Sequence, residues 1–243
     1  MKKILLSALI TIIASLVSFG QSVSGTPEAK KETFTSAQSI RDWKVPGELS
    51  LKDYRIFLDT EIFRNGSASG SIKSNSPVGK GKSAFLMQTI KADNYQGKRV
   101  QISAYVKSEN VEHATMWMRL DAGEMVVLGL DTMDDRPIQG TTDWQRYNLI
   151  LDVPEETQQI VFGIKLKGSG QIWIDDIEFE NVSANVPTTI TKTPIEFAKA
   201  SRRRIEQYKT TNKDDYEKQL QGFINRNAFT SLTPSNLDFE EKR

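Results

Sequence analysis

Alternation of apolar and polar positions dominates the chain from about residue 43 to residue 187. Short runs of β-branched and aromatic residues recur there, separated by Gly, Pro, Asn and Asp, which is the pattern of an all-β sandwich. The expected strands are Tyr54–Asp59, Ala68–Ser74, Ala84–Ile90, Arg99–Ser108, Ala114–Asp121, Met125–Leu130, Gln145–Leu151, Gln159–Lys167 and Gln171–Glu180. We predict an all-β, antiparallel jelly-roll sandwich, in which the short linker Gly168–Gly170 joins its two strands as a hairpin.

Alternation also separates the two faces of each strand, because successive side chains of a strand point to opposite sides. Val100, Met116 and Phe162 are examples of the apolar positions that are expected to face the core in three of the strands. The opposite positions carry aromatic and polar residues together, namely Gln101, Tyr105, Trp117, Arg119, Asp121 and Lys165. These six form the candidate ligand-binding face. Aromatic rings suit the apolar side of a sugar, and amide, guanidinium and carboxylate groups suit its hydroxyls. The alternative is that a loop or the C-terminal helices cover this face and its rings are ordinary packing residues.

An acidic pair near the end of the sandwich is the second candidate. Alternation turns Asp176 toward the core side, where an unpaired charge is costly. Hydrogen bonding within the protein is the favoured interpretation, since buried carboxylates are usually satisfied by protein groups. The alternative is a structural Ca²⁺ ion held by Asp176 and Asp59, because calcium prefers oxygen ligands.

The N-terminus has the features of a signal peptide. Lys2 and Lys3 precede the apolar run Ile4–Phe19, and Ser18 and Gly20 are small residues suited to cleavage. We therefore expect residues 1–20 to be removed and the protein to be secreted or periplasmic, with no membrane span afterwards. Residues 21–42 are polar and predict a flexible tether.

The sheet pattern stops after Val182, and residues 188–243 are expected to form a helical extension and tail. Thr193–Glu196 is a capping box with proline at the first helical position. It predicts a helix from Pro194 to Lys209, followed by another over Lys213–Asn225. The second helix places four apolar residues on one side, a surface that could bind a protein partner: Tyr216, Leu220, Phe223 and Ile224.

Composition narrows the classes of function. The chain has no cysteine, which excludes thiol catalysis and disulfides, and its only histidine, His113, excludes a multi-histidine zinc site. His113 follows a hydrophilic run and is expected in an exposed turn. Charges nearly balance, with 32 Lys and Arg against 31 Asp and Glu. The basic run Arg202–Arg204 spreads around a helix, so no nucleic-acid partner is expected.

Several motifs together resemble a bacterial domain family of uncharacterised role. They are Met87-Gln88, Tyr95–Val100, Asp131–Tyr147, Leu151–Pro154, Phe162–Ile164 and Gly170–Asp176. The family is similar in layout to carbohydrate-binding modules of the galactose-binding jelly-roll type. Its relatives look like accessory modules, sometimes attached to tail-specific (S41-type) peptidases and often labelled as AraC-type regulators. Pro234–Glu240 resembles the opening strand of another such module, which predicts a shortened relative of a multidomain protein.

The sequence thus predicts an exported, non-catalytic binding module whose ligand is a glycan or another small polar molecule. A protein-interaction or accessory module of an envelope protein system is the alternative. A hydrolase using carboxylates is a further alternative. Fold analogy alone does not decide among them.

Overall fold

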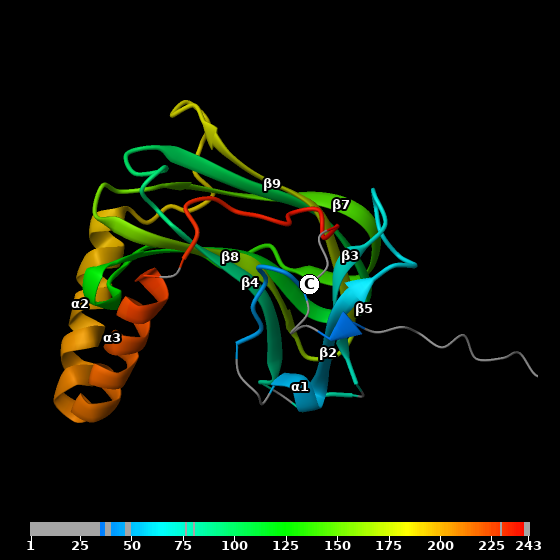
Figure 1. Cartoon of the computed structure of the whole chain (residues 1–243), viewed down its shortest axis with the longest axis horizontal. Coiled ribbons are helices and arrows are strands. Elements are labelled where there is room, and N and C mark those ends of the chain that lie inside the picture. The colour runs from blue at the N-terminus through cyan, green and yellow to red at the C-terminus, as the bar shows by residue number, and fades with distance from the viewer. Residues whose placement is uncertain are drawn as a thin grey trace, which may run out of the picture. The chain divides into compact units, whose positions relative to one another are not determined.

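The computed structural model describes residues 35–36, 40–46, 50–75, 77–79, 81–228 and 230–240. The predicted signal peptide and most of the predicted tether lie outside this part (Figure 1). The strands are β1 (Thr35–Ser36), β2 (Tyr54–Asp59), β3 (Ser69–Ser74), β4 (Ser83–Lys91), β5 (Arg99–Ala122), β6 (Val127–Asp131), β7 (Ile138–Asp152), β8 (Thr157–Lys167) and β9 (Gln171–Val182). The helical elements are α1 (Ser50–Asp53), the single turn η2 (Gly123–Met125), α2 (Pro194–Thr211) and α3 (Lys213–Ala228).

The 24-residue strand β5 is the spine of the fold. Its first half pairs with β9 on one edge and β7 on the other, whereas its second half pairs with β8 and β6. All of these pairings are antiparallel, and the order β1-β2-β3-β9-β5-β8-β4 completes the sheet. One continuous strand therefore belongs to both layers of the sandwich. The two strands expected at Arg99–Ser108 and Ala114–Asp121 are its halves.

β5 turns from one layer into the other between Val106 and Ala114, where its register with β7 shifts three times. Four residues near this bend have left-handed backbone conformations: Asn110 (φ 51°), Gly140 (φ 73°), Gly168 (φ 76°) and Gly170 (φ 122°). Such conformations favour Gly and Asn. A Cβ atom at Gly170 would also lie 2.6 Å from the Cα atom of Val111. His113 lies within β5 at this bend, so the prediction that it sits in a turn is wrong.

The prediction that Gly168–Gly170 closes a hairpin is also wrong. β8 and β9 do not pair with each other, because both pair with the same edge of β5 on either side of the bend. The linker has the length of a hairpin loop, but its two glycines carry the chain around the corner of the sandwich. Linker length alone does not distinguish these two geometries.

The two layers face each other across one apolar core. Val100 and Ile102 from the first half of β5 are buried, as are Met116 and Met118 from its second half. The rings of Phe162 in β8 and Phe179 in β9 meet across the layers, with centroids 5.3 Å apart. These contacts confirm the predicted antiparallel jelly-roll sandwich with its C-terminal helical extension, as well as the alternation on which the prediction was based.

Segments on both sides of residues 43–187 complete this core. Ile40 is fully buried before Trp43. Residues 231–240 return from α3 and lie along the gap between β4 and β9 (Figure 1). There the backbone N–H of Lys91 donates to Ser231 at 2.8 Å, and that of Ile177 donates to Leu237 at 3.2 Å. The segment that resembles the opening strand of a further module therefore packs into this same sandwich.

The two expected helices form close to their predicted bounds. The Thr193 side chain accepts from the backbone N–H of Glu196, and the Glu196 carboxylate accepts from that of Thr193, so the capping box is confirmed. α2 contacts β6. There the Val127 backbone N–H donates to the Ser201 hydroxyl at 2.9 Å. α3 buries Tyr216 and Phe223, while Ile224 stays half exposed. No helix in the described ranges is long and apolar enough to cross a membrane.

Candidate functional site

The bend in β5 divides the six predicted ligand-binding residues between two surfaces. Gln101 and Tyr105 lie on what we call the first outer face, formed by the outward side chains of β5 before the bend together with those of β7 and β9. Trp117, Arg119, Asp121 and Lys165 lie on the second outer face, formed by β5 after the bend with β4 and β8. Neither aromatic ring belongs to the buried core, which confirms that both point away from it. The two groups cannot touch one ligand together.

Trp117 lies near the middle of the second outer face. Its cross-strand neighbour in β8 is Gly163, which has no side chain. The indole ring of Trp117 therefore meets the ring of Phe85 in β4 across this gap, edge to face, with centroids 6.1 Å apart. Phe85 was missed in the sequence because both faces of β4 carry apolar residues, and alternation there gives no contrast.

Two polar atoms on this face are buried and have no hydrogen-bond partner in the described part of the chain. They are the indole Nε1 of Trp117 and the hydroxyl of Thr115, two residues earlier on the same side of β5. Buried polar groups are nearly always hydrogen-bonded, and a buried tryptophan N–H usually finds an acceptor. One donor and one hydroxyl without a partner therefore lie buried just beneath the second outer face, beside an aromatic ring.

Charged residues flank this pair. Arg119 holds Asp121 in a two-point ion pair, with Nε 2.8 Å from one carboxylate oxygen and Nη2 2.7 Å from the other. Lys165 Nζ lies 3.8 Å from the carboxylate of Asp134, which His113 approaches to 3.5 Å. A hydrogen bond from Thr132, aided by Lys165 and His113, lowers the pKa of Asp134.

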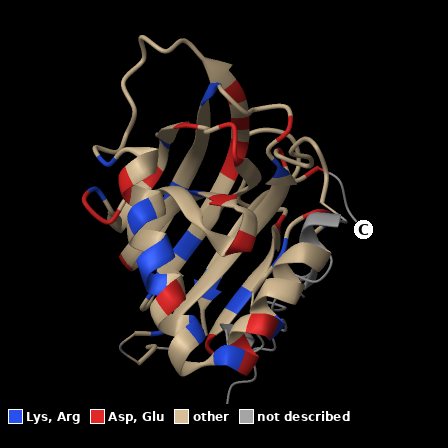
Figure 2. Cartoon of the chain, turned by 90° about the vertical axis from the view of Figure 1, so that its left-hand side faces the viewer, with Lys and Arg blue, Asp and Glu red and all other residues tan. Residues whose placement is uncertain are grey.

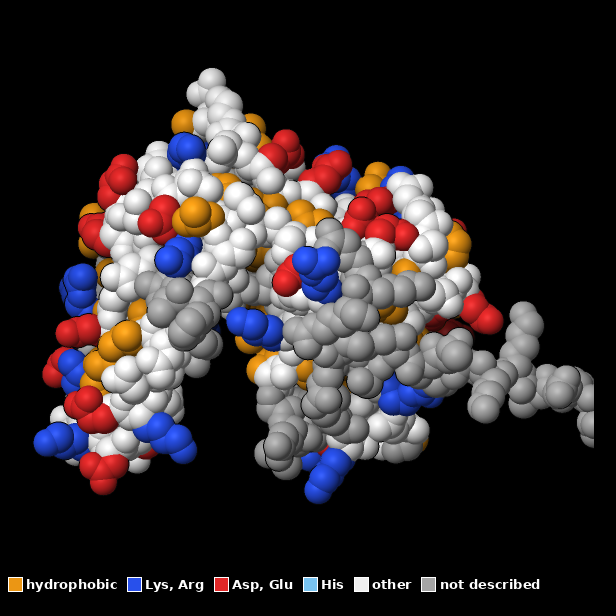
Figure 3. Space-filling model, in the orientation of Figure 1, with side chains coloured by type: hydrophobic (Ala, Val, Ile, Leu, Met, Phe, Trp, Pro, Cys, Tyr) orange, Lys and Arg blue, Asp and Glu red, His pale blue; other side chains and the backbone are white. Residues whose placement is uncertain are grey.

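α3 covers only one end of the second outer face. The side-chain amide of Gln159, cross-strand neighbour of Asp121, donates to the backbone carbonyl of Phe223 at 3.4 Å. Asp121 is buried at this end of the face, whereas the side chain of Arg119 remains 41% exposed. Figure 3 shows the surface hollowed between the α2–α3 pair and the part carrying β4 and α1. The sequence analysis left open whether the C-terminal helices cover the candidate ligand-binding face. In the structure, α3 covers only part of the second outer face.

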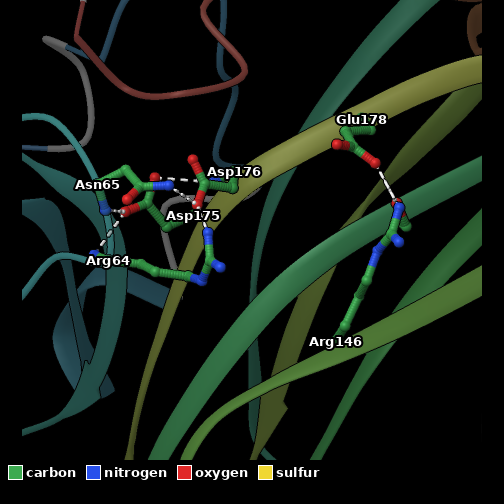
Figure 4. A network of polar contacts seen from close by, with 7 residues as sticks. Arg64, Asn65, Arg146, Asp175, Asp176 and Glu178 are labelled. Atoms are coloured by element: carbon green, nitrogen blue, oxygen red, sulfur yellow. Dashed lines mark hydrogen bonds and ion pairs between the residues drawn. The ribbon is translucent and has the colours of Figure 1, made fainter.

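The first outer face has a different character, because its polar groups are already paired (Figure 4). The guanidinium of Arg64 lies 3.5 Å from the ring centroid of Tyr105 and also pairs with Asp176. Arg146 pairs with Glu178, and the amide of Gln101 donates to Glu180 at 3.1 Å. Arg64, Tyr105 and Arg146, with Asp176 and Glu178, border a polar cleft of about 640 Å³ that the C-terminal tail also lines. A ligand of Tyr105 would have to displace Arg64.

Asp175, rather than Asp176, is the buried member of the acidic pair. Asp176 has a φ of 47° and lies in a bulge, where the register between β5 and β9 shifts, so it remains partly exposed. Asp175 accepts from the backbone N–H groups of Arg64, Asn65 and Asp176. Burial nevertheless raises the pKa of Asp175. The prediction that Asp176 turns toward the core was wrong because a bulge breaks strict alternation.

The two residues considered for calcium are engaged by protein donors. Asp59 accepts from the indole N–H of Trp173 at 2.8 Å and from two backbone N–H groups, those of Glu61 and Ile62. Asp176 accepts from Arg64 and Asn65. Within the described residues, no group of three or more His, Asp or Glu side chains could hold a metal ion. The geometry supports the hydrogen-bonding interpretation for both carboxylates.

Comparison with known proteins gives one curated relative in sequence. The chain is 40% identical over 167 residues to an uncharacterized HTH-type transcriptional regulator, YbfP, of Bacillus subtilis strain 168. The match covers 68% of this chain and 56% of that protein, so the chain spans little more than half of the relative's length. No family model matches the chain.

Solved structures with a similar arrangement include several carbohydrate-binding modules. One is the CBM22-1 xylan-binding domain of Xyn10C from Paenibacillus barcinonensis, with 12% identity, a TM-score of 0.44, and coverage of 62% of this chain and 94% of that one. Another is the enzymatically active domain of tailspike protein 4 of bacteriophage CBA120, with 15% identity, a TM-score of 0.45, and coverage of 59% and 20%. At such low identity and TM-score, the likeness does not extend to ligands.

Proposed function

We propose that this protein is a non-catalytic binding module that holds a glycan on the second outer face, with Trp117 at the centre of the site. The observation that carries the proposal is the pair of unused polar atoms, Trp117 Nε1 and the Thr115 hydroxyl, beside a partly exposed indole ring. A sugar ring offers an apolar C–H surface and hydroxyl groups at its edge. It can therefore stack on the exposed part of the indole ring. Its hydroxyl groups can reach the two buried atoms only if neighbouring side chains of this face move when the sugar binds.

The charged residues of this face supply the remaining contacts. Arg119 and Asp121 are held by their own ion pair, and the side chain of Arg119 is 41% exposed, so a partly exposed guanidinium is already held in place on this face. Lys165, 19% exposed and beside Asp134, adds a second cationic donor from β8, where it is the cross-strand neighbour of Thr115. Fixed, planar polar groups around an aromatic ring are the arrangement that recognises a polar ligand with little loss of side-chain entropy. The proposal includes export to the periplasm or beyond, for which the predicted signal peptide is the support.

Affinity electrophoresis through gels containing xylan, β-glucan, mannan or galactan tests the proposal. We expect at least one polysaccharide to retard the protein, and Trp117→Ala to abolish that retardation. Trp144→Ala is the matched control, because Trp144 is a partly exposed tryptophan outside the second outer face. Equal retardation of the wild type and Trp117→Ala would reject this site. Loss of retardation in both Trp117→Ala and Trp144→Ala would also reject it. Failure of every polysaccharide to retard the wild type would reject the carbohydrate class.

A module that docks a partner protein is the second candidate, favoured by two exposed apolar residues near α3. Ile224 is 51% exposed and Leu232 is 48% exposed, so both offer apolar surface to a partner. The similarity to a longer regulator supports a module that occurs joined to other parts. If the partner-docking function is the correct one, Ile224→Ser will weaken the protein's self-association or partner binding in sedimentation, and polysaccharide retardation will be absent.

A further inference from the structure

An apolar cavity of about 570 Å³ lies between the sandwich and the first turns of α2, away from both outer faces. Its wall includes Lys98, just before β5 begins, and Ala122, where β5 ends. The bend in β5 brings both ends of that strand to the same place, opposite the corner of the sandwich. α2 crosses this open end, and the cavity is the space that the helix leaves beneath it.

The floor of the cavity is apolar because it is made by the edge of the core. Leu128 in β6 and Val153 after β7 are 5% and 2% exposed, and Ala198 of α2 is 8% exposed. Ile195, one turn before Ala198, also lines the cavity but is 80% exposed. The apolar stripe of a surface helix normally faces the core. On α2 this stripe is covered by β6 at Ala198 but is open to solvent at Ile195.

The rim of the cavity is basic. Lys199 and Arg202 of α2 line it, are exposed, and have no ion-pair partner within the described residues. Lys98 adds a third cation from the sandwich side. Of the two acidic residues at the rim, Asp152 is held by Arg99 at 2.7 and 2.9 Å, which leaves Glu156 as the counter-charge. Figure 2 shows the Lys and Arg positions concentrated along α2.

We propose that this cavity binds an amphipathic carboxylate, with the alkyl chain against Leu128, Val153 and Ile195 and the carboxylate between Lys199 and Arg202. An apolar cavity of this size with a few convergent charged groups is the usual form of a small-molecule site. Burial of the chain removes apolar surface of both ligand and Ile195 from water. The cations at the rim then select an anionic head group over a neutral one. This site is separate from the proposed glycan face.

Calorimetric titration with decanoate tests the proposal, using Lys199→Glu/Arg202→Glu against the matched pair Arg203→Glu/Arg204→Glu. Both double variants change the same helix by the same charge, but Arg203 and Arg204 do not line the cavity. We expect saturable one-site binding, a loss of about tenfold or more in affinity for the first variant, and a change within about twofold for the second. Ile195→Ser should weaken binding roughly fivefold without affecting folding, because the side chain is already exposed.

Three outcomes would overturn the proposal. One is a lack of saturable decanoate binding to the wild type. Another is equal weakening by the two double variants, which would indicate attraction to a basic helix rather than to this cavity. The last is equal affinity for 1-decanol, which has the same chain length but neither a charge nor a sugar. Thermal melts of each variant show whether a loss of binding reflects unfolding, and Ile195→Ser keeps the test decisive if the charge variants are unstable.

Discussion

The ring of Phe239 stacks on the indole of Trp43, with centroids 5.0 Å apart and an interplanar angle of 25°. Phe239 is fully buried and Trp43 is 2% exposed. The indole N–H of Trp43 donates to the backbone carbonyl of Asn236 at 2.9 Å, and the Asn236 side chain donates back to the carbonyl of Arg41 at 2.9 Å. The C-terminal tail is therefore fastened to the N-terminal segment by both packing and hydrogen bonds.

Phe239→Ala tests whether the tail is part of the folding unit. Removing a fully buried phenylalanine should lower the free energy of unfolding by about 3–5 kcal/mol, because it leaves a cavity against Trp43. Urea denaturation followed by tryptophan fluorescence measures the loss. Phe63→Ala is the control, since Phe63 is 37% exposed. A loss no larger than that of the control would show that the tail is not held in the core.

Gly170→Ala tests the corner of the sandwich. The φ of 122° disfavours any side chain there, and the new methyl group would meet the backbone of Asn110 and Val111. We expect a loss of roughly 1–3 kcal/mol in the free energy of unfolding, or more. Gly79→Ala is the matched change, because nothing lies within 4 Å of its Cβ position. Equal effects of the two substitutions on melting temperature would contradict the assigned bend geometry.

Thr115→Val should separate stability from binding. Replacing an unpaired buried hydroxyl by a methyl group of the same shape removes a desolvation cost, so the free protein should gain about 1 kcal/mol. If the hydroxyl contacts a glycan, polysaccharide affinity should fall roughly tenfold at the same time. Thr157→Val is the control: its hydroxyl is also buried and unpaired within the described chain, but Thr157 is the first residue of β8, six positions before Gly163, the cross-strand neighbour of Trp117. That variant should gain stability and bind normally, and a loss of binding there would count against the site.

Asp175 predicts a pH dependence of stability. Burial raises its pKa above the ordinary value of 3.8, so the folded protein holds this proton more tightly than the unfolded chain does. Stability from this carboxyl group is fully present below 3.8 and is lost as the pH rises through the folded value. The unfolding free energy of the wild type minus that of Asp175→Asn should therefore decrease across this range. A rising or flat difference would contradict the assignment.

Asp143 provides the opposite sign for comparison. Hydrogen bonds from Lys107 and from the backbone N–H of Trp144 lower its pKa. Stability from Asp143 is present above the ordinary value and is lost as the pH falls through the lowered one. The difference between the wild type and Asp143→Asn should thus increase with pH, in contrast to that for Asp175→Asn.

Alternation predicted the strands well because it reports a local fact, namely which side of each strand meets the core. β2 has the predicted bounds of Tyr54–Asp59, and β8 extends the predicted Gln159–Lys167 by two residues at its start. Alternation does not report which layer a strand joins. Tyr105 and Trp117 both point outward as expected, but the bend between them places them on different surfaces.

Features that depend on distant parts of the chain could not be predicted in this way. Phe239 is buried by Trp43, about two hundred positions earlier, and no local pattern marks that pairing. Arg64 lies in the segment after β2 and contacts the ring of Tyr105 in β5. No sequence pattern around either residue predicts that contact. The unused hydroxyl of Thr115 is recognisable only once every possible partner around it has a position.

The contacts of residues 231–240 hold the C-terminal tail beside residues 40–46, so segments from the two ends of the described chain lie together. Glu240 accepts from the backbone N–H groups of Ser67 and Ala68 at the rim of the polar cleft. A protein joined downstream of Glu240 would therefore leave the sandwich at that rim and not from the helices. Its orientation would be set by residues 231–240, which also complete the core. Tension on such a fusion would therefore act directly on this segment, which lies between β4 and β9.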